Sequence, residues 1–159
     1  MASFTVEFND TALQAAFKQL AERGTNVRPL LYEIGAALLE TTRDRFDAEQ
    51  SPGGQKWQAL NPLYAAYKSA GKVRRKDGDK ARITPSVNKI LHLSLTLRDS
   101  IVMDVGTDTL EISTGIKYAR VHQLGGGSRK MPARPFLGVS ESDKDFIREA
   151  AVDYLTKGF

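Results

Sequence analysis

The stretch SIVMDVGTDTLEIST, residues 100–114, decides the fold of this chain. Its two halves flank the turn sequence Gly-Thr-Asp, and apolar residues alternate along each half. Alternation with a period of two on both sides of such a turn is typical of antiparallel strands joined as a hairpin. We therefore predict a hairpin with strands over 100–105 and 110–114, whose alternating residues are Ile101, Met103, Val105, Leu110, Ile112 and Thr114.

A helix over residues 26–48 is the longest element that the sequence predicts. Asn26 can cap its start, and Pro29 suits the first turn, where a missing N–H costs nothing. Apolar side chains then recur at helical spacing, and the pattern ends near Ala48 among charges of alternating sign.

Shorter patterns complete the predicted architecture. Helical spacing predicts a helix over about 11–23 and another that starts at Ser140 or Ser142. The fold class that follows is α+β, with long helices packed on a small antiparallel β-sheet. Further predictions are an opening strand at Phe4, Val6 and Phe8, a short helix within 90–98, a polar loop over 118–127, an extended stretch over 131–135 and a final strand over 136–139.

Composition limits the classes to which this protein can belong. With 159 residues and 41% hydrophobic side chains, the chain fits a single globular domain, residues 1–159. It has no cysteine, which excludes disulfides, thiol nucleophiles and cysteine-ligated metals. No stretch approaches the roughly 20 apolar residues of a membrane span, and the first residues lack the pattern of a signal peptide. We expect a protein that stays inside the cell in which it is made, without membrane contact.

Residues 50–89 break the pattern of long periodic elements, and we interpret them as a flexible insertion. Residues 68–90 contain eight basic and two acidic side chains, so the net excess of positive charge lies there. This long basic loop can contact nucleic-acid phosphates or an acidic protein surface, or it can be a solvated loop that maintains solubility. The candidate contact residues are Lys68, Lys72, Arg74, Arg75, Lys76, Lys80 and Arg82.

Three aromatic residues precede the basic loop. Trp57, Tyr64 and Tyr67 can stack on nucleic-acid bases, but their spacing fits one apolar helical face better. We therefore favour a core or interface role for these side chains.

The sequence contains no recognisable catalytic or cofactor-binding pattern. His92 and His122 lack the spacing of metal ligands, and we expect each to make a structural hydrogen bond. The GGGSRK stretch at 125–130 lacks the strand and helix that flank a phosphate-binding loop. Asp143 and Asp145 are expected to stabilise a helix start rather than to form an acid–base pair. We expect no enzymatic activity, no metal and no cofactor.

Several blocks of this sequence, taken in order, resemble the phage virion morphogenesis family, also described as tail completion proteins of Mu-like and P2-like tailed bacteriophages. The resemblance covers about residues 26–157. One departure is Ser94-Leu95, where the family commonly has Thr-Gly. The most specific blocks are YARVHQLGG (118–126) and MPARPFLG (131–138), supported by TTRDRF (41–46), SPGGQKWQAL (51–60), KILHLSLTLRDSI (89–101) and VGTDTLEISTG (105–115).

The resemblance implies a structural virion protein that acts at the neck, where a DNA-filled head meets the tail, after assembly in the cytoplasm of the bacterial host. Relatives form rings, often of six copies. The implied partners are therefore further copies of this chain, the head–tail connector, and tail tube or terminator proteins, with packaged DNA as a further candidate. A tail terminator ring that stops tube polymerisation fits as well. A small nucleic-acid-binding protein that uses residues 68–90 is a third reading.

The blocks that resemble the family supply candidate contacts between subunits or with a partner. In MPARPFLG, Arg134 can bind a carboxylate or a backbone carbonyl, and Phe136 and Leu137 can anchor in a neighbouring subunit. The same residues can instead brace the fold internally. The candidate interface residues are Trp57, Tyr118, His122, Gln123, Arg134, Phe136 and Leu137.

Overall fold

The computed structural model describes residues 26–70, 89–126 and 130–156, together with Thr11, Ala15 and Lys18. Those three isolated residues are helical, within the span predicted as the first helix. The predicted opening strand, the rest of the first helix and most of the basic loop lie outside the described residues. No helix in the described part of the chain is long and apolar enough to cross a membrane.

Helix α2, Arg28–Ala48, confirms the longest predicted element. Pro29 occupies its first turn, and the Asn26 side-chain oxygen accepts a hydrogen bond from the Arg28 N–H at 3.2 Å. The N-cap position itself is Val27, one residue later than predicted. The helix ends at Ala48, and its C-cap Glu49 has a left-handed φ of 54°, which stops further helical hydrogen bonding.

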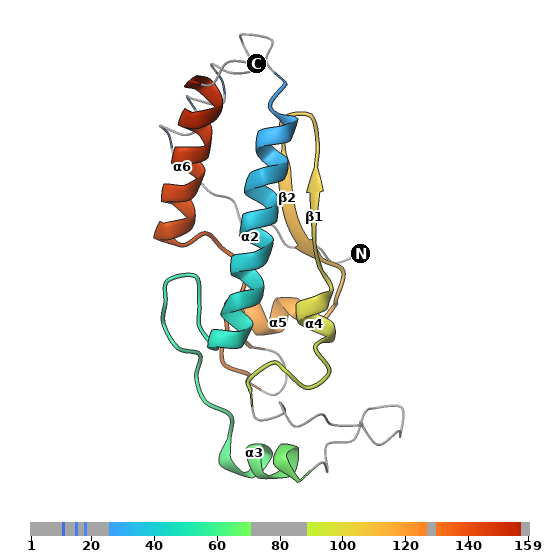
Figure 1. Ribbon diagram of the computed structural model, residues 1–159. Helices are drawn as coiled ribbons and strands as arrows, with labels where there is room; N and C mark the ends of the chain where they lie inside the picture. The colour runs from blue at the N-terminus through green and yellow to red at the C-terminus, as the bar shows by residue number, and fades with distance from the viewer. Residues whose placement is uncertain are drawn as a thin grey trace.

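The predicted hairpin is present as strands β1, Ile101–Val105, and β2, Leu110–Thr114. They pair antiparallel, with Met103 opposite Ile112. Helix α2 packs against this hairpin on one side and against helix α6, Glu141–Thr156, on the other (Figure 1). Gly35 permits the close approach to the hairpin, because a Cβ atom there would lie 2.7 Å from the Leu110 side chain. Helices packed on a small antiparallel sheet confirm the α+β class.

Two hydrophobic clusters stabilise these layers. The first lies between α2 and α6 and contains Leu30, Leu31, Ile34, Ile147 and Ala151 together with Val27. The second surrounds the C-terminal end of α2 and gathers side chains from segments far apart in sequence. Burial of each large apolar side chain contributes about 1.5–3 kcal/mol. The members of the second cluster are Phe46, Trp57, Ile90, Leu97, Ile101, Ala119, Phe136 and Leu137.

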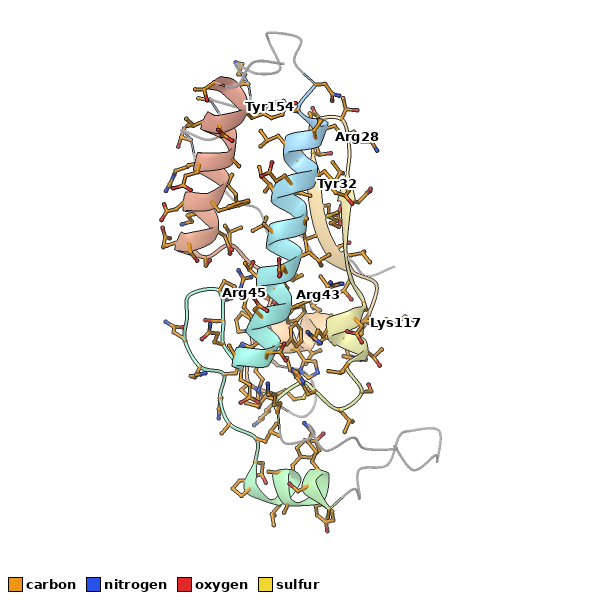
Figure 2. The ribbon with its side chains drawn as sticks, viewed as in Figure 1. Arg28, Tyr32, Arg43, Arg45, Lys117 and Tyr154 are labelled. Atoms are coloured by element: carbon orange, nitrogen blue, oxygen red, sulfur yellow. The ribbon has the colours of Figure 1, made fainter. Side chains whose placement is uncertain are left out.

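Helix α6 begins as the sequence predicted. Ser140 and Asp143 form a reciprocal cap: the Ser140 Oγ accepts from the Asp143 N–H at 3.1 Å, and the Ser140 N–H donates to the Asp143 carboxylate at 2.8 Å. Asp143 also pairs with Arg45 on α2. Figure 2 shows Arg45 on the lower half of α2, on the side facing the start of α6, and Tyr154 near the beginning of α2. The Tyr154 hydroxyl donates to the Asn26 carbonyl at 2.6 Å, so α6 is bonded to α2 near its start and to the segment just before α2 near its end.

Two predictions in the C-terminal half are wrong. The stretch predicted as a polar loop contains helix α5, Ala119–Leu124, and residues 136–139 form no strand. Gln123 explains the second error, because its Oε1 accepts from the Phe136 and Leu137 N–H groups and its Nε2 donates to the Leu137 carbonyl. These backbone groups are bonded to a side chain instead of a neighbouring strand. The short helix expected within 90–98 is present only at the end of that stretch, as α4, Thr96–Asp99, and residues 90–95 are not helical.

Candidate functional site

Helix α3, Pro62–Ser69, lies at one end of the molecule, away from the other helices and the hairpin (Figure 1). The Asn61 side chain caps it by accepting from the Leu63 and Tyr64 N–H groups, and Pro62 fills the first position. Leu63 is 74% exposed and Tyr67 is 58% exposed. A helix that presents large apolar side chains to solvent is typical of an interaction surface.

The structure separates the three aromatic residues that the sequence placed on one helical face. Tyr64 and Tyr67 are on α3, but Trp57 precedes the helix and is buried against Phe46, with 5.6 Å between ring centroids. The Trp57 ring N–H donates to the Pro135 carbonyl at 2.8 Å. The prediction of a shared face is therefore wrong, because residues 57–60 are not helical and the Trp57 ring is buried in the core.

A groove of about 1030 Å³ lies beside α3. Its apolar lining comes mainly from leucines, one methionine and prolines, and its charged lining consists of Lys68, Lys130 and Arg134. No carboxylate occurs among the described residues that line it. We call this the α3 groove; its lining is Gln58, Ala59, Leu60, Asn61, Pro62, Tyr64, Lys68, Leu91, Leu93, Ser94, Thr96, Leu97, Tyr118, His122, Lys130, Met131, Pro132 and Arg134.

Arg134 is buried in the wall of the α3 groove, with 6% of its surface exposed. Its Nε and Nη2 atoms donate to the Gln58 carbonyl at 3.1 and 3.0 Å, which ties the segment after Trp57 to the segment after α5. Within the described residues, no carboxylate lies within ion-pair distance of its guanidinium. Burial lowers the pKa of Arg134, and Tyr64 opposes this shift.

Lys68, which the sequence placed in the basic loop, is also buried. Its Nζ donates to the Lys89 carbonyl, which joins α3 to the chain that returns after the basic loop. Burial lowers the pKa of Lys68, whereas the charge of Glu49 raises it. Lys68 was predicted as a contact to DNA or an acidic partner, and its burial shows that any such contact would lie inside the α3 groove and not on an open surface. The other basic candidates, Lys72 to Arg82, lie outside the described residues.

His122 lines the α3 groove from helix α5. Its ring packs edge-on against Tyr118, with 5.8 Å between ring centroids. The Nδ1 atom is buried and has no hydrogen-bond partner among the described residues, so the predicted structural hydrogen bond is absent there. Burial, reinforced by the charge of Arg134, lowers the pKa of His122.

Four further candidate interface residues face the interior of the subunit. Phe136 is fully buried, and Trp57, Gln123 and Leu137 are nearly so. Their contacts support the internal bracing that the sequence left open as one of two roles. Tyr118 is exposed at the groove, which leaves its side chain accessible to another molecule.

His92 makes the structural hydrogen bond that the sequence predicted. It is buried beneath the end of α2, and its Nε2 donates to the Phe46 carbonyl at 3.0 Å, since a carbonyl can only accept. Burial lowers the pKa of His92, and the hydrogen bond to Phe46 opposes this shift. Within the described residues, no group of three or more His, Asp or Glu side chains is arranged to hold a metal ion.

The lowered pKa values predict that acid destabilises this fold. The native state binds protons at His92 and His122 more weakly than the unfolded chain, so stability is complete above the unfolded histidine pKa of about 6.5 and decreases below it. We expect His122→Gln to reduce the pH dependence of the unfolding free energy between about pH 7 and 5 by up to about 1.4 kcal/mol per pH unit. Urea unfolding across this range measures the slope. Identical slopes for the variant and the wild type would contradict the prediction.

Comparison with known proteins identifies the family to which this architecture belongs. The sequence pattern of the phage virion morphogenesis family matches residues 8–156. The chain belongs to this family. It is also 30% identical over 147 residues to the Mu-like prophage FluMu G protein 1 of Haemophilus influenzae, an alignment that covers 90% of this chain and 86% of the relative. No solved structure matches the chain. Membership in this family assigns the protein a structural or assembly role in a phage virion.

The sequence predicted a helical face at Tyr64 and Tyr67 but not where helix α3 begins, although the signal for its start was present. Asn61 followed by Pro62 is a cap and first-turn pair, and the next seven residues contain no helix breaker. The burial of Lys68 and Arg134 had no comparable signal, because it depends on chain segments that meet only in the folded protein.

Proposed function

We propose that this protein is a non-enzymatic component of the phage neck, where copies form a ring that completes the tail or joins it to the DNA-filled head. Family membership carries the proposal, because it assigns the chain to virion morphogenesis. The expected position in the virion is the head–tail junction, and the expected ring contains six copies.

The surface at α3 supports a role in assembly. Leu63, Tyr64 and Tyr67 present apolar area to solvent beside the α3 groove, and interfaces are enriched in such aromatic side chains. The proposed partners are further copies of the chain, the head–tail connector, and tail tube or terminator proteins. The basic residues 72–82 supply candidate contacts to packaged DNA or to an acidic partner.

Electron microscopy of lysates tests the proposed function. The parent phage would carry a stop codon early in this gene, with a plasmid copy of the gene as the complementation control. DNA-filled heads beside free tails of normal length are the expected result. Tails of uncontrolled length would overturn the joining or completion role in favour of a tail terminator. Intact infectious virions would overturn the neck assignment altogether.

A further inference from the structure

The α3 groove contains two buried cations, neither of which forms an ion pair with a carboxylate among the described residues. Glu49 acts on Lys68 as a nearby charge that raises its pKa. Arg134 and Lys68 are almost fully buried, yet their hydrogen-bond partners among the described residues are the carbonyls of Gln58 and Lys89. Buried lysine and arginine side chains are usually paired with an anion, because removal of a charge from water is costly. Arg134 has five N–H donors, and two of them are used within the described residues.

A third polar group in the same groove has no hydrogen-bond partner among the described residues. The His122 Nδ1 is buried and unpaired among the described residues, and its ring belongs to the lining that includes Arg134 and Lys68. Three groups able to donate hydrogen bonds therefore share one groove whose described lining contains no carboxylate. This arrangement is complementary to an anion that enters from outside.

The remaining lining favours a protein segment over nucleic acid. Leucines 60, 91 and 93 together with Met131 and Pro132 form apolar walls, and the two principal cations are buried rather than displayed on the surface. DNA phosphates are typically contacted by exposed basic side chains that displace counterions. A carboxylate flanked by apolar side chains matches both the charge and the walls.

We propose that the α3 groove binds an apolar, acidic segment of a partner protein, whose carboxylate pairs with Arg134 and Lys68 and accepts a hydrogen bond from His122. The choice of a virion protein as the source of this segment rests on the proposed function. The acidic and apolar character of the segment follows from the charges and walls of the groove alone. Leu63 and Tyr67 on α3 extend the contact surface beyond the groove.

Binding of two five-residue peptides with blocked ends to the full-length protein tests the proposal. One alternates leucine with glutamate and aspartate, and the other replaces these acids with glutamine and asparagine. NMR titration would follow the His122 ring and the Arg134 side chain. We expect the acidic peptide to bind at least about tenfold more tightly than its neutral counterpart, with affinity that falls as salt rises. Equal affinity, or no shift of either side chain at millimolar peptide, would overturn the proposal.

A matched pair of variants at Thr96 localises the binding without disturbing the buried cations. Thr96 is exposed at the groove, and its hydroxyl bonds only to Ser94 among the described residues. Thr96→Glu places a competing carboxylate there and should weaken binding of the acidic peptide about tenfold. Thr96→Gln adds a side chain of similar size without the charge, and we expect it to bind the acidic peptide more tightly than Thr96→Glu by most of that factor. Val152→Glu, on the exposed face of α6, adds the same charge outside the groove and should have little effect.

Two other results would assign the groove to a different occupant and overturn the proposal. Shifts of His122 and Arg134 on addition of a DNA duplex, but not of the acidic peptide, would indicate a nucleic-acid site. Shifts that grow with protein concentration alone would indicate a second copy of this chain. Because the titration uses purified protein without phage, its failure is distinguishable from failure of the neck assignment in the lysate experiment.

Discussion

Asp143→Ala is expected to lower the free energy of unfolding by about 3–5 kcal/mol, because it leaves the buried guanidinium of Arg45 without its counter-charge. Arg45 would keep its hydrogen bonds to the Phe136 and Gly138 carbonyls, and these cannot replace the carboxylate. The variant also removes the acceptor for the Ser140 N–H at the start of α6. Urea unfolding monitored by circular dichroism measures the loss.

Two companion variants separate the causes of this loss. Asp143→Asn keeps an oxygen that can accept from Ser140 but removes the charge, so we expect an intermediate effect. Asp145→Ala removes a carboxylate from the same helix turn that is exposed and paired with Arg148, so its effect should stay within about 1 kcal/mol. A loss for Asp143→Ala no larger than that of Asp145→Ala would show that the buried pair does not stabilise the fold.

Phe136→Ala is expected to cost about 3–5 kcal/mol as well, through the cavity it opens in the second hydrophobic cluster. The Phe136 ring is fully buried and lies 5.3 Å from the Phe46 ring, which in turn contacts Trp57. Partial collapse cannot fill the space, because the neighbouring backbone is held by Gln123.

The same unfolding measurement distinguishes the two roles that the sequence left open for Phe136. Leu63→Ala, at an exposed position on α3, serves as the control and should change stability by no more than about 0.5 kcal/mol. If Phe136→Ala retained full stability and instead prevented assembly of virions, the residue would be an intersubunit anchor. A large loss of stability in the isolated protein would identify it as part of the internal core.

Local sequence patterns predicted the elements whose hydrogen bonds lie within the element itself or with a close neighbour in the chain. The hairpin over 101–114, helix α2 with Pro29 in its first turn, and the cap of α6 at Ser140 are of this kind. The family was also recognisable at this level, because its blocks are short and contiguous. Helix α5 was missed because the glycines after it suggested a loop, whereas they follow a helix that ends at Leu124.

The sequence predicted several individual residues of the α3 groove, but not the groove itself. Arg134, His122, Tyr118 and Lys68 were each candidates, but the sequence placed Lys68 in a basic loop and the others in two separate blocks, without bringing them to one groove. Their common location follows from long-range bonds: Arg134 to Gln58 and Lys68 to Lys89. Such pairings have no periodicity in the sequence.

By itself, the sequence determined the α+β class, the principal helices and hairpin of the described residues, and membership in the phage virion morphogenesis family. The tertiary structure alone decided which charged side chains are buried, that Gln123 bonds the chain at 136–137, and that α3 carries apolar side chains exposed to solvent. The physical reason is the range of the interactions. Caps, turns and periodic faces act over a few residues, whereas burial and buried hydrogen bonds depend on segments that only the folded chain brings together.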